Sequence, residues 1–338
     1  MVIFGAGASY DSDPTRPSAN YVLPTPHRPP LANQLFDNRP EFARDLSAFP
    51  ECIPIVPLLR HTSAIEQQLE RLRNEATEDP PYRQRLRQLA AVRGYLQLVL
   101  SGCDERWLEE VRGITNYSTL LDEMLRWGHQ RAVLVTFNYD RLLERAITLG
   151  DPRRQFVDLG DYLSDDAFSV IKVHGSANWG RVVKNEAAPS QPWDGVHRLI
   201  ASADSLEITN EYVVSQDRPI ANDGRGRALV PAIAIPVESK QTFECPDEHL
   251  KHLTELLPQV GTVLIVGWRG MDNHFVEILK QHMGPKVHGE VVCGNQGWAE
   301  EVVNRLTAAG VPARLKPRDV GFTEYVVRRL GAELFRLR

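Results

Sequence analysis

Four short stretches of small and polar residues each follow directly on an apolar run of the sequence. They are residues 5–9 (GAGAS), 136–140 (TFNYD), 174–178 (HGSAN) and 267–272 (GWRGMD). If the apolar runs are parallel strands, their carboxyl ends share one edge of a sheet, where open sheets of this kind bind ligands. We therefore expect the four stretches to converge on one binding site.

The first stretch consists of Gly5, Ala6, Gly7, Ala8 and Ser9. Small residues after a strand let backbone N–H groups approach a phosphate at the amino end of a helix. The dinucleotide-binding fingerprint has a third glycine, whereas Tyr10 follows here, and then a proline-rich segment. A tight turn from strand to helix is therefore an equally open interpretation.

Asn138 and His174 are the candidate catalytic residues. A carboxamide donates and accepts hydrogen bonds at once, so Asn138 can orient a sugar hydroxyl and a water molecule together. An imidazole, with an unperturbed pKa of ~6.5, suits a general base at cellular pH. Gly175 beside it would let another chain or a ligand come close. Structural alternatives stay open: a histidine at a strand end is commonly structural, and for Asp140 a helix cap is the favoured interpretation.

The fourth stretch begins where an apolar run ends at Gly267, and the turn after it can contact a ribose or a phosphate. By default, Asp272 is the cap of the helix that follows. Gly294 and Asn295 close the next apolar run in the same way. For these two residues an ordinary turn and a ligand contact are about equally good interpretations.

The elements that must position these residues are expected to alternate between strands and helices. Apolar runs predict strands at residues 2–4, 132–137, 168–174, 262–268, 289–293 and 313–316. Helical spacing predicts helices around residues 142–147, 275–283 and 298–306, the last one ending near Gly310. This alternation predicts an α/β fold, a Rossmann-like parallel sheet with helices on both faces.

Between the first two strands, the spacing of apolar residues from about 60 to 128 predicts helices. We expect one domain, residues 1–338, with a helical subdomain inserted at 38–130 after the first strand region. An oligomer interface and a lid are both reasonable roles for it. A helix start is expected within residues 29–36. Residues 180–230, rich in Pro, Asp and Ser, are expected to be loops.

Composition narrows the possible function classes. The chain has 338 residues, 42% of them hydrophobic and 25% charged, as in an ordinary soluble globule. Its net charge of −5 gives no electrostatic case for direct nucleic-acid binding by the whole chain. No apolar run is long enough to span a membrane. The four scattered cysteines form no CxxC pair, which predicts no zinc site and fits a reducing cytoplasm.

The order of the four stretches along the chain, and their position after apolar runs, resemble the sirtuin family. The resemblance extends from residue 1 to about residue 295. The chain departs from the protein-deacylating sirtuins in lacking their zinc-binding CxxC pairs and their Phe-Arg-Ser signature, and their late Gly-Thr-Ser turn is replaced by residues 267–270. Residues 29–36 (PPLANQLF) and 267–272 look more like the zinc-less, sirtuin-like proteins of bacterial anti-phage defence. That resemblance implies an NAD hydrolase that depletes NAD in abortive infection.

The resemblance also implies roles for the candidate residues. Asn138 would hold a water molecule or the ribose hydroxyls, and His174 would accept a proton. Residues 5–9 would cradle the pyrophosphate of NAD, which is the substrate, and no zinc is needed. The remaining binding candidates are Asp140, Gly175, Gly267, Asp272 and Asn295.

The same family contains members that act with a separate sensor, either an ATPase or an Argonaute-like protein. Because this chain has no large sensor domain, the resemblance implies a homo-oligomer or a separate activating subunit. Three other functions stay open. These are a non-catalytic sensor of NAD or ADP-ribose, an NAD-dependent protein deacylase and a dehydrogenase.

Overall fold

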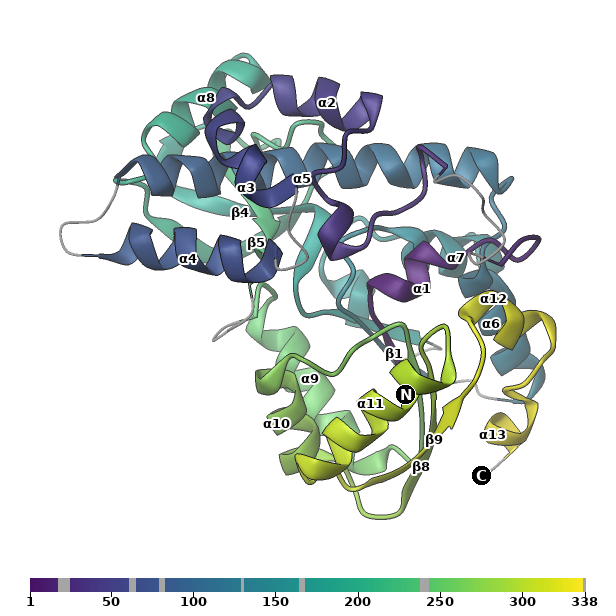
Figure 1. Ribbon diagram of the computed structural model, residues 1–338. Helices are drawn as coiled ribbons and strands as arrows, with labels where there is room; N and C mark the ends of the chain where they lie inside the picture. The colour runs from purple at the N-terminus through teal and green to yellow at the C-terminus, as the bar shows by residue number, and fades with distance from the viewer. Residues whose placement is uncertain are drawn as a thin grey trace.

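A computed structural model describes residues 1–17, 25–60, 65–78, 83–128, 131–163, 168–237 and 243–336 (Figure 1). Its centre is a six-stranded, wholly parallel sheet with the strand order β3-β2-β1-β7-β8-β9. The strands are β1 (Val2–Phe4), β2 (Ala132–Thr136), β3 (Phe168–Lys172), β7 (Thr262–Val266), β8 (Val287–Val292) and β9 (Ala313–Arg318). All six predicted strands are therefore confirmed, and so is the Rossmann-like fold class.

Alternate residues of the strands point to opposite faces of the sheet, and each face is covered by helices. Val2 and Phe4 pack with one set of helices, whereas Ile3 packs with the other. The first set contains α1 (Ala6–Tyr10), α6 (Asn116–Arg126), α7 (Leu142–Gly150), α12 (Phe322–Val327) and α13 (Ala332–Arg336). The second set contains α9 (Asp247–Leu256), α10 (Asn273–His282) and α11 (Gln296–Ala308). Strands buried on both faces explain why their sequences are nearly continuous apolar runs.

The strand order places a topological switch point between β1 and β7. From β1 the chain enters α1 on one face, and from β7 it enters α10 on the other face. The two connections diverge at the carboxyl edge of the sheet, and a crevice of this origin is the usual ligand site of a doubly wound fold.

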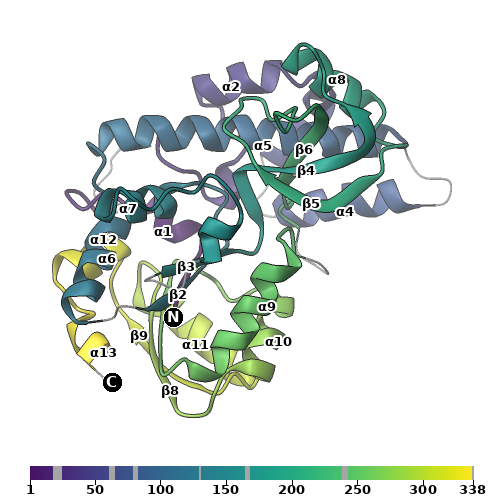
Figure 2. The same ribbon diagram turned by 180° about the vertical axis from the view of Figure 1, so that it is seen from behind.

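A second layer lies beside the carboxyl edge of the sheet and is crossed by the long helix α5 (Arg83–Glu110) (Figures 1 and 2). Its other helices are α2 (Pro40–Ser47), α3 (Val56–Arg60), α4 (Ile65–Thr77) and α8 (Pro192–Ala201). It also contains an antiparallel sheet of order β5-β4-β6, formed by β4 (Gly175–Ala187), β5 (Ile208–Val214) and β6 (Arg227–Ile233). Short 3₁₀ turns complete the order: Ala32–Gln34, Pro50–Ile55, Gly160–Leu163 and Leu257–Gln259.

The expectation that residues 180–230 are loops is wrong, because this region contributes most of the antiparallel sheet and helix α8. Its strands are buried by α5, which packs on both β4 and β6. Ala177, Ile200 and Ile233 share one core with α5. The second layer is thus a mixed α/β unit rather than a purely helical one.

Helices α2 to α6 lie between β1 and β2 in the chain, as expected of an insertion there. Helix α6 packs on the main sheet, whereas α2 to α5 share the core of the second layer. The bounds 38–130 of the inserted subdomain stay a prediction. The predicted helix start at 29–36 is a single 3₁₀ turn, Ala32–Gln34. No helix in the described part of the chain has the length and apolarity to cross a bilayer.

Candidate functional site

Glycines bring the loops after β1 and β7 into direct backbone contact. Gly5 N–H donates to Val266 O at 2.9 Å, and Gly7 N–H donates to Gly267 O at 3.2 Å. Gly267 has φ +62°, and a Cβ added there would lie 2.4 Å from Ala8 N. Only glycine tolerates both that backbone conformation and that approach. The sequence GAGAS therefore serves first to join the two loops at the switch point.

Asn138 leaves β2 at the same edge and is fixed to the first loop. Its Nδ2 lies 2.9 Å from Gly5 O, 2.9 Å from Ser9 Oγ and 3.1 Å from Tyr117 OH. The side chain is buried, with the residue 6% exposed. Within the described residues no donor reaches the amide oxygen of Asn138. The amide nitrogen is thus used for positioning, and the oxygen is left to accept a hydrogen bond.

In place of the helix cap favoured from the sequence, Asp140 lies one residue before the N-cap position of α7, Arg141, and its Oδ1 accepts from Leu142 N at 3.2 Å. Burial raises the pKa of this carboxyl, while the neighbouring Lys172 ammonium and a hydrogen bond from Ser9 act in the opposite direction. Lys172 is fully buried, donates to Asp140 O and forms an ion pair with Glu144 at 3.0 Å. A buried ammonium needs such partners. Through its bond to the Asp140 carbonyl, Lys172 helps to fix the position of the loop at residues 138–142.

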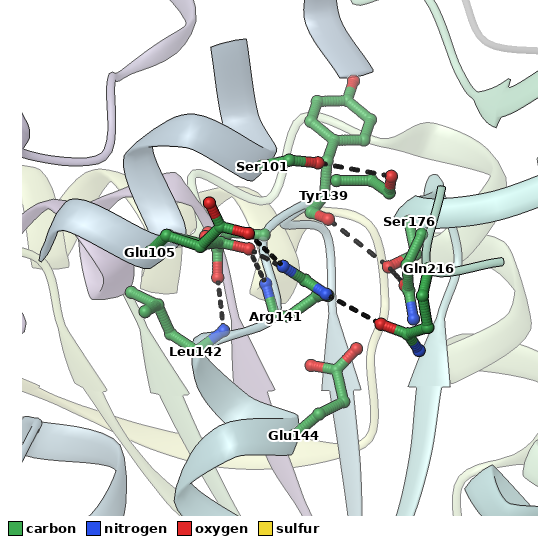
Figure 3. Close-up of polar contacts among 12 residues, drawn as sticks. Ser101, Glu105, Tyr139, Arg141, Leu142, Glu144, Ser176 and Gln216 are labelled. Carbon is green, nitrogen blue, oxygen red and sulfur yellow. Dashed lines mark hydrogen bonds and ion pairs between the residues drawn. The ribbon is translucent and has the colours of Figure 1, made fainter. Parts of the chain in front are cut away.

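Arg141 ties the same loop to the second layer (Figure 3). Its backbone N–H donates to Asp104 Oδ2 of α5 at 2.8 Å, and its guanidinium reaches Gln216 Oε1 at 3.4 Å. Burial, followed by the charge of Asp140, raises the pKa of Asp104 to about 7. A polar cavity of about 90 Å³ lies behind the loop, between α5, the start of α7 and residues 215–218.

His174 follows β3 and pairs with a carboxylate from a distant part of the chain. Its Nε2 lies 2.9 Å from Asp272 Oδ2, and both side chains are buried. The second carboxylate oxygen of Asp272, Oδ1, accepts from Phe275 N at 3.1 Å, so Asp272 caps α10 as predicted. The ring of Phe137 packs edge-on against the His174 ring, with centroids 4.9 Å apart.

The structure brings most of the predicted site residues to one edge, in two groups. Residues 5–9, Asn138 and Gly267 form one group beside α1. His174 and Asp272 form the other group at the start of α10. Phe137 joins the groups, since it adjoins Asn138 in the chain, contacts the His174 ring and stacks on Trp268 at 4.9 Å. The candidate catalytic residues Asn138 and His174 thus belong to two groups that Phe137 links.

Two predicted binding residues have other contacts. Gly175 has φ +82°, and a Cβ there would lie 1.9 Å from Ala232 O, so this glycine allows β6 to pass close to the strand end. That is the chain-contact alternative expected for it from the sequence. Asn295 is exposed and caps α11, its Oδ1 accepting from Trp298 N at 3.0 Å. Its place at the end of β8 is at the same edge of the sheet, farther from the switch point.

Sequence reasoning did not single out Tyr117, Asp104 or Lys172 as parts of the site. Lys172 gave a usable signal, because a lysine inside an apolar strand must find a buried partner. Tyr117 of α6 and Asp104 of α5 contact the site only through the packing of separate elements. In the described part of the chain no group of three His, Cys, Asp or Glu residues is arranged to hold a metal ion.

No protein-family description matches the chain, and no curated protein matches it significantly. Among solved structures, a Sir2 homologue in complex with NAD is 15% identical, with a TM-score of 0.40, and the match covers 99% of this chain and 90% of that one. A substituted Sir2 homologue in complex with ADP-ribose is 15% identical, with a TM-score of 0.41 and coverages of 100% and 93%. Sir2 bound to an acetylated peptide is 14% identical, with a TM-score of 0.39 and coverages of 98% and 91%. Likeness of this degree transfers neither activity nor ligand.

Proposed function

We propose that the protein is an NAD glycohydrolase that cleaves the bond between nicotinamide and ribose to give nicotinamide and ADP-ribose. The observation that carries the proposal is the Asn138 carboxamide. It is held by its nitrogen against residues 5–9 at the switch point of a doubly wound sheet, and its oxygen accepts no hydrogen bond from the described residues. A neutral acceptor fixed at the carboxyl edge of such a sheet suits a ribose hydroxyl or the attacking water.

Cleavage of the bond between nicotinamide and ribose needs little general acid catalysis. As the bond breaks, positive charge develops on the ribose, as in glycoside hydrolysis. Nicotinamide leaves as a neutral molecule because it starts as a cationic pyridinium, so no group has to protonate it. The site must orient the ribose and one water molecule, and positioning of this kind supplies up to ~7–11 kcal/mol. Asn138 would orient the water or the ribose, and His174 would take the proton.

The pyrophosphate would lie against the first turn of α1. Two backbone donors of this loop, Gly5 N–H and Gly7 N–H, already bond to the β7 loop. The phosphate would therefore rely on the first-turn N–H of Ala6 and on the dipoles of the turn. Asp140, Gly267, Asp272 and Asn295 would shape the rest of the NAD site, with Gly175 supporting it from the side of β6.

The biological role proposed here follows from the sequence resemblance: depletion of cytoplasmic NAD when phage infection is sensed. The trigger would act through homo-oligomerisation or through a separate sensor subunit, an ATPase or an Argonaute-like protein. The second layer, which α5 connects to the Asn138 loop through Asp104, is the natural route for such a signal.

The direct test is release of nicotinamide from NAD by the purified protein together with its copurifying partners. We expect Asn138→Ala and His174→Ala to abolish most of the release, whereas Asn304→Ala and His288→Ala, at exposed positions of α11 and β8, leave it unchanged. Full activity in either site variant contradicts the assignment.

A non-catalytic sensor of NAD or ADP-ribose is the second candidate, since the same residues would serve binding alone. Binding measured by calorimetry, with NAD intact after long incubation beside every native partner, would favour the sensor. A zinc-less protein deacylase would instead show NAD-dependent turnover of an acylated peptide.

A further inference from the structure

The contact between His174 and Asp272 joins residues 98 positions apart and has no counterpart in the sequence pattern. The Nε2–Oδ2 distance is 2.9 Å, and the two side chains are 8% and 6% exposed. A buried carboxylate facing a buried imidazole at this distance fixes the ring strongly, since water does not compete for the bond.

Asp272 is itself held by a second contact. Its Oδ1 accepts from Phe275 N at 3.1 Å as the N-cap of α10, a helix of 10 residues. The positive end of the helix dipole favours the charged carboxylate there. One oxygen is thus committed to the helix and the other to His174, so the carboxylate cannot turn away without uncapping α10.

The imidazole ring is held by packing as well. The Phe137 ring stands at 80° to the His174 ring with centroids 4.9 Å apart, and Phe137 is in turn stacked on Trp268 at 16°. Turning the ring over would break the bond to Asp272 and disturb this aromatic cluster. The nitrogen that faces the carboxylate is therefore always Nε2.

A carboxylate only accepts hydrogen bonds, and a neutral imidazole carries one N–H. The neutral ring must therefore place its proton on Nε2, and Nδ1 then holds the lone pair. We propose that Asp272 is a positioning residue that fixes this tautomer of His174, so that Nδ1 is the atom that accepts the proton. The inference rests on the proposed hydrolase function for its kinetic part only.

In the proposed reaction the carbon–nitrogen bond breaks and its electron pair leaves with nicotinamide. Water adds its oxygen to the ribose carbon, and its proton goes to Nδ1 of His174. The resulting imidazolium faces the Asp272 carboxylate, which stabilises the positive charge. Loss of that proton to solvent then restores the neutral ring.

Asp272→Asn tests the tautomer while keeping the helix cap, because asparagine and aspartate cap helices equally well. With its oxygen on Phe275 N, the amide would turn its NH₂ toward Nε2, and the ring would be driven to the Nδ1–H tautomer. We expect KM for NAD to change little and kcat to fall by about 10²- to 10⁴-fold, as when a triad aspartate is replaced by asparagine. Asp272→Ser also retains a cap but orients no tautomer, and is expected to lose less activity than Asp272→Asn.

The spectroscopic readout does not depend on turnover. ¹⁵N NMR of the ligand-free protein labelled at histidine, with His174→Gln to assign the signal, should show the proton on Nε2 in the wild type and on Nδ1 in Asp272→Asn. Asp247→Asn makes the same chemical change in the first turn of α9 and should alter neither the signal nor kcat.

A wild-type proton on Nδ1, or an unchanged tautomer in Asp272→Asn, would overturn the inference. So would full kcat in Asp272→Asn if the wild type is active. A wild type that cleaves no NAD but shows the expected tautomers would refute the hydrolase function and leave the positioning role of Asp272 supported.

Discussion

At the scale of the residue, the carboxamide of Asn138 has two ends with different tasks. The nitrogen bonds to the Gly5 carbonyl and the Ser9 hydroxyl, and it lies within reach of Tyr117 OH. The oxygen accepts no hydrogen bond from the described residues. A residue that served only as a helix cap would use its oxygen on a backbone N–H, as Asp272 does, so the geometry separates Asn138 from the caps.

Asn138→Asp should destabilise the fold, because it replaces the buried NH₂ donor with a charged oxygen that faces the Gly5 carbonyl, which can only accept. Breaking a buried polar arrangement and leaving an uncompensated charge costs roughly 3–5 kcal/mol. The free energy of unfolding, from urea titration at pH 7, measures the effect. Asn304→Asp makes the same change on the exposed side of α11 and should stay within about 0.5 kcal/mol of the wild type. Equal stability of the two variants would show that the Asn138 contacts are weak.

Asp104 should make stability depend on pH in an unusual direction. Burial raises its pKa in the folded state to about 7, above the usual value near 3.8. The folded protein therefore holds this proton more tightly than the unfolded chain, and the contribution is complete below pH ~4 and is lost as pH rises toward 7. Asp104→Asn removes the titration, so the stability of the variant relative to wild type should rise between pH 5 and pH 8. A constant difference across that range would contradict the raised pKa.

The individual site residues were predictable to the extent that each ends an apolar run. Asn138 and His174 stand at strand ends, and the cap formed by Asp272 follows from local rules. The pairing of Asp272 with His174 was not predictable, because sequence spacing does not say which cap faces which strand end. That depends on the strand order, which sets β1 and β2 between β3 and β7.

At the scale of the element, the switch point depends on contact between two glycine loops. We expect Gly267→Ala to cost several kcal/mol, since its Cβ would lie 2.4 Å from Ala8 N and its φ is +62°. The same substitution should weaken NAD binding, because it would separate the loop after β1 from the loop after β7. Gly150→Ala at the end of α7 meets open space and should be neutral or stabilising by up to about 1 kcal/mol. Thermal unfolding measures the stability of the two variants, and calorimetry measures their NAD binding. Similar melting temperatures would refute the close contact.

The contrast between the main sheet and the second sheet shows what an apolar pattern can predict. Strands β2 and β7 are covered on both faces, so they appear as unbroken apolar runs. β4 begins with GSANWGR, and its polar residues are buried by α5, a helix that ends 65 positions earlier. Gln97 of α5, for example, donates to Ala177 O at 3.2 Å. Burial of polar residues by a distant helix leaves no periodic signal in the strand itself.

At the scale of the whole molecule, Met1 and the last described helices are both held against the main sheet. The Met1 amino group donates to Thr262 O at 2.8 Å, and burial lowers the pKa of that group to about 5. The C-terminal helices α12 and α13 share the core beneath β1 and α6. The loop after α1 follows residues 5–9 in the chain. This loop contacts the C-terminal helix α12.

Thr323 makes this link across 312 residues. Its hydroxyl donates to Asp11 Oδ1 at 2.8 Å, its N–H donates to Asp11 Oδ2 at 3.1 Å, and Asn116 of α6 donates to the Thr323 hydroxyl at 2.7 Å. All three groups are buried. The C-terminal segment therefore braces the loop that positions Ser9 and, through it, Asn138.

Thr323→Val keeps the shape of the side chain and removes only the hydroxyl, leaving Asn116 and Asp11 without that partner. Loss of a buried hydrogen-bonding group costs about 1–3 kcal/mol. We expect the amides of α12 and α13 to exchange faster with solvent deuterium. We expect the free energy of unfolding to fall, with only a small loss of NAD turnover. Thr77→Val, at an exposed hydroxyl that donates to Asn74 O, serves as the control. If exchange in α12 stays at the wild-type rate, the C-terminal segment is held by its apolar face alone, and the brace on the Ser9 loop is not needed.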